Sequence, residues 1–533
     1  MAVTDGPDVV VVGAGFAGMY TLRRCRMLGL RARAFEAGTG VGGTWYWNRY
    51  PGARCDVESM EYSYSFDENL QQEWNWSERY AAQPEILSYA NHVADRFDLR
   101  RDITFGTRVL RAVWDATTAT WTVHTDGGEE VVAPYLVMAT GCLSSTNTPD
   151  IPGLASFAGE LHHTGNWPHE AVDFRGKRVG VIGTGSSAVQ AIPVIADTAG
   201  HLTVFQRTPQ YSVPARNRPL EVDEVAATKA DYATFRERNR RMPAGFGSRY
   251  PRNETSVFDV SEDDARAELQ FRWERGGTTF MGAFGDLALD REANEIAASF
   301  VREKIAETVT DPEVAARLTP THVIGCKRLC IDTEYFATFN RDNVTLVDVG
   351  TDPIESITPA GVRTGGVEHE LDMLILATGF DAMTGTLLRI DIRGRDGATL
   401  RDAWAAGPRT YLGLSVAGFP NLFMVSGPGS PSVLTNMIVS IEQHVEWITD
   451  CIDHLRRTGR RSIEATPEAQ EDWVAHVNSI ADKTLYPTCN SWYLGANVPG
   501  KTRVFMPLLG FPPYVETCRR VVDNDYEGFT VGV

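Results

Sequence analysis

Two short glycine-rich signatures constrain the fold of this chain more than any other feature of its sequence. Gly13-Ala-Gly15-Phe-Ala-Gly18 follows the β-branched run Val9 to Val12, and Gly183-Thr-Gly185-Ser-Ser-Ala188 follows a second strand pattern at 177–182. A helical pattern comes after each signature. A strand, a glycine turn and a helix N-terminus in this order let the backbone approach a pyrophosphate, which free amides then stabilise. We therefore predict an α/β protein with two dinucleotide-binding, Rossmann-like domains.

The residue that ends the second strand of each unit distinguishes the two expected cofactors. Glu36 lies where an acid binds ribose hydroxyls, about 20 residues after the glycines, and this suits FAD. At the matching distance from Gly183 the chain has Gln206, followed by Arg207 and Thr208. A guanidinium without a neighbouring carboxylate favours a 2′-phosphate, so we predict NADPH rather than NADH. The expected cofactor contacts in the two signatures are Gly13, Gly15, Gly18, Glu36, Gly183, Thr184, Gly185, Ser186, Ser187, Arg207 and Thr208.

A long loop from Gly42 to Asp56 follows the first unit and has neither a helical nor a strand period. It is rich in glycine, aromatic residues and arginine, and Asp56 is its only carboxylate. Loops of this length beside a cofactor motif usually carry ligand contacts, although an aspartate that caps a turn is the alternative. Lys327 and Arg328 are adjacent basic residues much later in the chain, and solvated surface charge is their default interpretation.

Two nearly identical segments, Leu136 to Gly141 and Leu374 to Gly379, indicate places where the chain crosses between domains. We predict a division into three parts. Residues 1–143 and 383–533 form an FAD-binding domain, 144–214 and 323–382 form an NADPH-binding domain, and 215–322 form a mostly helical insertion in the second. The charge of the insertion is expected to be solvated helix surface.

Composition excludes several classes of function. A net charge of −18 argues against nucleic acid, because a phosphate backbone requires a basic stripe. No apolar run reaches the roughly 18 residues of a membrane helix, and the N-terminus leads into a strand, so we expect a cytoplasmic protein. The eight cysteines contain no Cys-x-x-Cys pair, so we expect free buried thiols in a reducing compartment and no metal site.

A third pattern lies between the two signatures, where it is a candidate connector between the cofactor domains. It has the form Phe157-x-Gly159-x-x-x-His163-x-x-x-Trp167-Pro168. Together with the loop from Gly42 to Asp56, it resembles the pattern of type I Baeyer–Villiger monooxygenases, which are class B flavoprotein monooxygenases. The similarity is greatest to the phenylacetone and steroid monooxygenase group. Related enzymes that oxidise nitrogen or sulfur usually carry Tyr where Trp167 stands.

The resemblance implies that NADPH reduces FAD, that O₂ adds at the flavin C4a carbon, and that the resulting peroxide attacks a ketone. The product is an ester or a lactone, with sulfoxidation as a side activity. Matched by position, Arg328 is the catalytic arginine, Asp56 orients it, and Lys327 joins Arg207 and Thr208 at the 2′-phosphate. The remaining implied cofactor contacts are Gly43, Thr44, Trp45, Tyr62 and Trp492, and the implied substrate cavity is formed by Leu143, Ser432, Val433, Leu434, Met437 and Met506.

Two other functions stay open at this point: a flavin monooxygenase that oxidises nitrogen or sulfur, and a non-catalytic NADPH-binding sensor. The segment 505–514 departs from the glycine pair of the family pattern and is one residue shorter, so the resemblance does not define the cavity shape near Met506 and Pro507. His163 invites the role of a general base, but we expect it to couple NADPH binding to the flavin domain. The expected partners are a small ketone and O₂, without nucleic acid, a membrane or an obligate protein partner.

Overall fold

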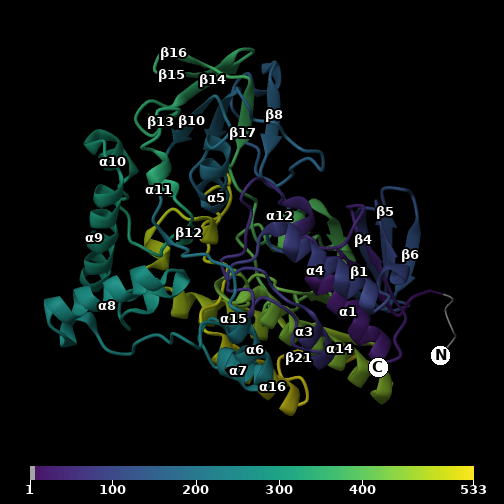
Figure 1. Cartoon of the computed structure of the whole chain (residues 1–533). Coiled ribbons are helices and arrows are strands. Elements are labelled where there is room, and N and C mark those ends of the chain that lie inside the picture. Colours follow the sequence, from purple (N-terminus) through teal and green to yellow (C-terminus); the bar gives the residue numbers. More distant parts are fainter. Residues whose placement is uncertain (1–5, 533) are drawn as a thin grey trace.

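Two parallel sheets, each with helices packed against it, organise the molecule (Figure 1). The computed structural model describes residues 6–532, so residues 1–5 and 533 of the predicted FAD-binding division lie outside it. In spatial order, the first sheet contains β19 (Leu422–Met424), β7 (Tyr135–Met138), β1 (Val9–Val12), β2 (Ala32–Phe35) and β3 (Ile103–Thr104). The second contains β13 (Val344–Asp348), β10 (His201–Gln206), β9 (Arg178–Ile182), β17 (Met373–Leu376) and β8 (Glu160–His163). This is the predicted fold class.

The four valines of β1 show why the first sheet is covered on both faces. All four are buried, and a continuous apolar run is typical of a parallel strand packed on two sides. Val9 and Val11 belong to the core that includes α1 (Phe16–Met27) and α14 (Met437–Thr458). Val10 and Val12 pack instead with a mixed sheet of β18 (Asp391–Arg393), β4 (Val109–Asp115), β5 (Thr120–Thr125) and β6 (Glu130–Ala133), in which only the β18–β4 pair is parallel.

The chain crosses between the two sheets at two matching places, as the repeated segments predict. After β7 it passes into the second sheet, and after β17 it returns to the first. Each crossing packs against one of the two glycine turns. The turn residues Gly13 and Gly183 have positive φ values of 103° and 114°. A Cβ atom on these glycines would lie 2.6 Å from the Ala139 oxygen and 2.5 Å from the Ala377 oxygen, respectively. Only glycine fits at both positions.

The segment between β11 (Ser212–Pro214) and β12 (Cys330–Asp332) is mostly helical, as the predicted fold class requires, whereas the division into domains with the bounds 215–322 stays a prediction. Its helices are α6 (Val222–Ala230), α7 (Tyr232–Arg240), α8 (Glu262–Arg275), α9 (Arg291–Thr308) and α10 (Pro312–Leu318). They do not form one body. Residues of α8, α9 and α10 share the core of the second sheet, whereas Tyr232 and Phe235 of α7 pack into the core of the first. The insertion therefore contacts both halves of the molecule (Figure 1).

The predicted connector and the loop from Gly42 to Asp56, in which no regular period was found, both contain short elements. The stretch from Phe157 to Pro168 holds β8, the edge strand of the second sheet, so it is more than a connector. The loop from Gly42 to Asp56 contains one helical turn, α2 (Thr44–Trp47). The Trp167 amide donates to the Trp47 carbonyl at 3.4 Å, which joins the two stretches across the sheets.

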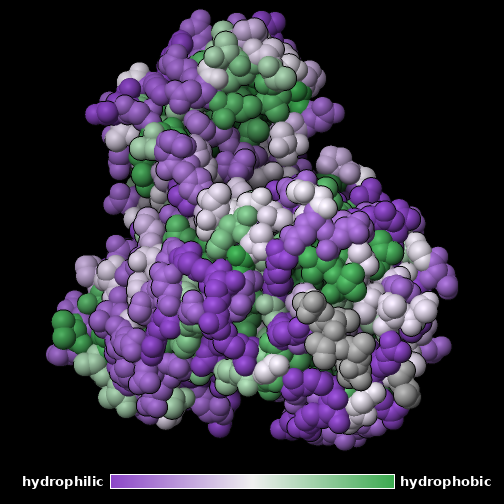
Figure 2. All heavy atoms as spheres, turned by 90° about the vertical axis from the view of Figure 1, so that its right-hand side faces the viewer, coloured by the Kyte–Doolittle hydropathy of each residue, from purple (hydrophilic) through white to green (hydrophobic). Residues whose placement is uncertain are grey.

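The surface carries mostly hydrophilic residues on the face that Figure 2 shows, with apolar residues in separate patches. Across residues 6–532, no helix is both long enough and apolar enough to cross a membrane.

Candidate active site

Arg328 and Asp56 are 272 positions apart in the sequence and form an ion pair in the structure. Nε and Nη2 of Arg328 both donate to Oδ2 of Asp56, at 3.0 and 2.6 Å. Nη1 donates to the backbone oxygen of Val433 at 2.8 Å. Because these three bonds use three nitrogens of the guanidinium, its plane and position are fixed. Because the Asp56 carboxylate accepts two bonds from Arg328, the structure favours the interpretation that Asp56 orients this arginine over the alternative that it caps a turn.

The surroundings of Arg328 keep it charged. Burial acts to lower the pKa of Arg328, but the charge of Asp56, its hydrogen bond and a contact with Tyr493 together raise that pKa above its usual value. The Arg328 side chain is 26% exposed and that of Asp56 is 25% exposed, so one side of the pair remains open. The pair is therefore a fixed cation with an accessible face.

Lys327 and Arg207 lie close together beside the second signature. Burial and then the charge of Arg207 lower the pKa of Lys327. Neither cation forms an ion pair with a carboxylate of residues 6–532. The Thr184 hydroxyl donates to the Thr208 oxygen at 2.7 Å and holds this turn against the signature. Two neighbouring cations without a carboxylate are suited to an anion such as a 2′-phosphate.

Glu36 ties the end of β2 to the first glycine turn. Its side chain is buried, and its two oxygens accept from the amides of Ala14 and Gly38, each at 2.7 Å. A carboxylate oxygen can accept a second bond, so the predicted ribose contact stays possible and stays a prediction. Gly43 packs closely on this turn, because a Cβ on Gly43 would lie 2.9 Å from the Cα atom of Gly15.

The other predicted cofactor contacts lie near the same two turns. Trp45 Nε1 donates to the Tyr62 hydroxyl at 3.1 Å, and Thr44 begins α2. In the second signature, Gly185 precedes α5 (Ser186–Ala196) in an extended conformation. The Ser186 hydroxyl contacts Cys330 Sγ at 3.2 Å, and Ser187 follows in the first turn of α5. Gly18 is required by close packing, since a Cβ there would lie 1.9 Å from the Gly13 oxygen.

The predicted substrate-cavity residues come together in one apolar cluster. Leu143, Val433, Leu434, Met437 and Met506 all belong to it, as do Trp492 and Tyr493. Ser432 lies beside the cluster, where its hydroxyl contacts Met383 Sδ at 3.6 Å. Because Arg328 contacts both Tyr493 and the Val433 carbonyl, the cluster adjoins the guanidinium. The sequence interpretation did not include Tyr493, whose only signal is its place next to Trp492 in an aromatic loop.

The fingerprint residues from Phe157 to Pro168 make contacts around β17 and the second crossing. His163 Nδ1 accepts from the Gly165 amide at 3.0 Å, and Nε2 lies 3.3 Å from the Thr378 hydroxyl in the second crossing. A Cβ on Gly159 would lie 2.4 Å from the Asp372 oxygen and 2.7 Å from the Phe157 ring. Trp167 is buried and precedes Pro168. These contacts are consistent with a coupling role for His163, which stays a prediction.

Two of the eight cysteines are not free thiols, and that prediction was wrong for them. Cys326 and Cys489 form a disulfide, whereas the other six are buried and free. The pairing has no local signal because 163 positions separate the two residues, and a long-range pair cannot be deduced from spacing. The bond joins the segment just before Arg328 to the loop that carries Trp492 and Tyr493.

Cys489→Ser is expected to lower the free energy of unfolding by about 2–5 kcal/mol, because the disulfide closes a long loop of the unfolded chain. Thermal unfolding with and without a thiol reductant measures the effect. The reductant should lower the midpoint of the wild type and leave that of Cys489→Ser unchanged. Cys518→Ser, which removes a buried free thiol, should keep the wild-type sensitivity to reductant. If reductant leaves the unfolding midpoint of the wild type unchanged, the disulfide between Cys326 and Cys489 is contradicted.

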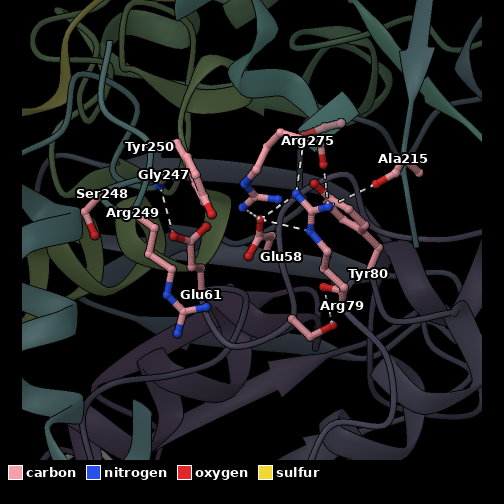
Figure 3. A network of polar contacts seen from close by, with 12 residues as sticks. Glu58, Glu61, Arg79, Tyr80, Ala215, Gly247, Ser248, Arg249, Tyr250 and Arg275 are labelled. Carbon is pink, nitrogen blue, oxygen red and sulfur yellow. Dashed lines mark hydrogen bonds and ion pairs between the residues drawn. The ribbon is translucent and has the colours of Figure 1, made fainter. Parts of the chain in front are cut away.

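A network of charged side chains surrounds Glu58, which follows Asp56 by two positions (Figure 3). Glu58 accepts from Nε and Nη2 of Arg79, at 3.1 and 3.0 Å, and from Nη2 of Arg275 at 2.6 Å. Arg275 ends α8, so this network joins the insertion to the loop that carries Asp56. No sequence pattern indicated it.

This chain is similar to known proteins over nearly its whole length. The family model for pyridine nucleotide-disulphide oxidoreductases matches residues 7–228. A Baeyer-Villiger monooxygenase of Pseudooceanicola batsensis is 46% identical over 503 residues, which cover 94% of this chain and 91% of that protein. Phenazine N-monooxygenase PhzNO1 of Lysobacter antibioticus is 44% identical over 529 residues, 98% of this chain and 96% of that protein.

A solved structure of oxidized steroid monooxygenase bound to NADP is 54% identical, with a TM-score of 0.94 and coverage of 99% of both chains. The sequence identities extend over nearly the whole length of this chain. The chain also contains both parallel sheets, both glycine turns and the Arg328–Asp56 ion pair. The chain therefore belongs to the Baeyer–Villiger monooxygenase family.

Proposed function

We propose that this protein is an FAD- and NADPH-dependent Baeyer–Villiger monooxygenase that inserts one oxygen atom next to a ketone carbonyl. The products are an ester or a lactone, NADP⁺ and water. The observation that carries the proposal is the Arg328 guanidinium, fixed by Asp56 and the Val433 carbonyl beside an apolar cluster. A fixed positive charge next to apolar side chains suits a reaction that places negative charge on an oxygen of an apolar substrate.

The two glycine turns fit the two cofactors. FAD would lie at the turn of Gly13, Gly15 and Gly18, with contacts from Glu36, Gly43, Thr44, Trp45 and Tyr62. NADPH would lie at the turn of Gly183 and Gly185, with its 2′-phosphate on Lys327, Arg207 and Thr208 and with Trp492 closing over it. When bound, the flavin accepts a hydride from NADPH and activates O₂.

Arg328 supplies electrostatic stabilisation in the proposed reaction. Its charge would stabilise the oxyanion that develops when the ketone carbonyl is attacked, and Asp56 would hold the guanidinium in the required orientation. Because the hydrogen bonds exist before the substrate binds, the site does not reorganise as charge develops. A lysine could supply the charge but not several donors in one plane.

The apolar cluster would hold the carbon skeleton of the ketone and exclude water from the oxyanion. Leu143, Val433, Leu434, Met437 and Met506 would line this space, with Ser432 at its edge. Sulfoxidation would be a side activity of the same site. We also propose that the protein is located in the cytoplasm and acts without nucleic acid or an obligate protein partner.

Oxidation of nitrogen or sulfur is the second candidate, because one relative is a phenazine N-monooxygenase by name. The fixed guanidinium favours the ketone reaction, since oxygen transfer to a nitrogen or sulfur lone pair produces no carbonyl oxyanion. A panel of ketones, a thioether and a phenazine, each incubated with the holoenzyme, NADPH and O₂, separates the two. We expect esters or lactones by gas chromatography. Oxidation of the thioether or phenazine without any ester would contradict the proposal.

A further inference from the structure

A cavity with mostly polar and charged residues in its lining lies between Asp56 and the helical insertion. Its space of about 300 Å³ includes open solvent, and the part that water can occupy has room for about one water molecule. Asp56, Glu58 and Glu61 line it from one chain segment, and Tyr250, Arg275 and Thr279 line it from the insertion. Figure 3 shows Glu58 and Glu61 directed toward the insertion side chains. The cavity therefore joins the carboxylate that holds Arg328 to a second group of ionisable residues.

The lining of this cavity is suited to water. Arg275 Nε and Thr279 Oγ1 are buried, and residues 6–532 supply no hydrogen bond to either atom. Buried polar atoms are normally satisfied by protein groups or by ordered water. A polar cavity with carboxylates, a guanidinium and a hydroxyl in its walls offers the several partners that a bound water needs.

Glu61 is a buried carboxyl without a counterion. It is 4% exposed, and Oε1 accepts from the Gly247 amide at 3.0 Å. The neighbouring cations have other partners. Arg249 donates to Glu224 and Thr228, Arg236 donates to the Glu61 backbone oxygen and to Ser63, and Arg275 donates to Glu58. Among the described residues, no cation pairs with the Glu61 side chain.

These surroundings change the acidity of Glu61. Burial and then the charge of Glu58 raise the pKa of Glu61 to about 7, against smaller opposing effects of the Gly247 amide, Arg249 and Arg236. Charged and titratable groups surround Glu61 on all sides. They are Asp56, Glu58 and Tyr80 from nearby parts of the same chain, Arg236 from α7, Arg249 and Tyr250 from the loop after α7, and Arg275 from α8. Glu61 can therefore exchange a proton near neutral pH.

The proposed reaction consumes one proton from solvent in each turnover. A ketone, O₂, NADPH and H⁺ give an ester, NADP⁺ and water, so the hydride and the proton both end in the water molecule. We propose that Glu61 relays this proton from solvent to the Asp56 end of the cavity, through water held between the two carboxyl groups, and that from there the proton enters the water molecule that the reaction releases. Glu61 releases a proton to this water and is reprotonated from solvent, so it returns to its starting state. Glu61 acts through this water as a positioning residue and does not contact the substrate.

Glu61→Gln tests the relay, which rests on the proposed function. Glutamine keeps the size of the side chain and can accept the Gly247 bond, but it cannot ionise. In the wild-type holoenzyme, the rate of ester formation should show an inflection near pH 7. In Glu61→Gln this inflection should disappear, the rate at pH 7 should fall on the order of tenfold to hundredfold, and the solvent isotope effect should increase.

Glu442→Gln is the matched control. Glu442 is a second buried carboxyl whose pKa is raised by burial, but it accepts from Ser65 and Phe66 outside the cavity. This variant should keep the inflection near pH 7. If Glu61→Gln also keeps it, the relay is wrong even when esters form. If the wild type forms no ester or lactone, the proposed function fails instead.

A stability measurement provides a readout that is independent of turnover. The usual pKa of a glutamate is 4.5 and the folded value is about 7, so burial of Glu61 costs stability progressively as pH rises through this window. The unfolding midpoint of Glu61→Gln relative to the wild type should therefore increase from about pH 4.5 to about pH 7. A difference that does not depend on pH would overturn the assignment. If the variant does not fold, infrared titration of ¹³C-glutamate in the wild-type holoenzyme must show a carboxyl that titrates near 7, and its absence overturns the proposal.

Discussion

Arg328→Ala is expected to retain FAD and to lose ester formation by a factor of at least about 10²–10³, the usual cost of removing one preorganised electrostatic donor. FAD should stay bound, because its predicted contacts lie at the first glycine turn and not at the guanidinium. Flavin absorbance of the purified variant measures the first result, and gas chromatography of the products measures the second.

Two further variants separate the charge of Arg328 from its orientation. Arg328→Lys keeps a positive charge but loses the planar set of donors that reaches both Asp56 and the Val433 carbonyl. Asp56→Ala keeps the guanidinium but removes its partner, so we expect slower flavin reduction and weaker oxygenation than in the wild type. Both losses should be smaller than that of Arg328→Ala. Normal ester formation in Arg328→Ala would refute the role of this residue.

Arg207→Ala is expected to reduce the preference for NADPH over NADH by about ten- to a hundredfold. A hydrogen bond to a charged group contributes about 1.5–3 kcal/mol, and the 2′-phosphate is the only difference between the two nucleotides. Lys327→Ala should act in the same direction, because the two cations lie together. Steady-state kinetics with each nucleotide give the preference.

Lys177→Ala is the control for these two variants. Lys177 forms an ion pair with Glu160 on the edge of the second sheet and does not lie at the turn of Arg207. It should leave the nucleotide preference unchanged. If Arg207→Ala and Lys327→Ala also leave it unchanged, the 2′-phosphate does not bind at these residues.

The parts of the fold that depend on local chemistry could be predicted from the sequence. Gly13 and Gly183 require positive φ and close backbone contact, so each marks a turn between a strand and a helix. The two Ala-Thr-Gly segments mark the crossings, because the backbone of each packs against one of these turns. In such places a few consecutive residues determine the structure.

Features that depend on distant segments could not be predicted in this way. The Arg328 and Asp56 pair was assigned by family resemblance alone, since 272 positions separate the two residues. Neither family resemblance nor residue spacing indicated three further features. These are the Cys326–Cys489 bond, the packing of α7 on the core of the first sheet and the cavity beside Glu61. Each of these depends on which surfaces meet after folding.

Incubation of the holoenzyme with NADPH, a ketone and ¹⁸O₂ tests the central claim most directly. The claim is that this chain transfers one atom of O₂ to the position between the carbonyl carbon and its neighbour. Mass spectrometry of the product should find one ¹⁸O atom in the bridging oxygen of the ester or lactone. An unlabelled ester, or consumption of NADPH without any ester from a broad panel of ketones, would contradict the account.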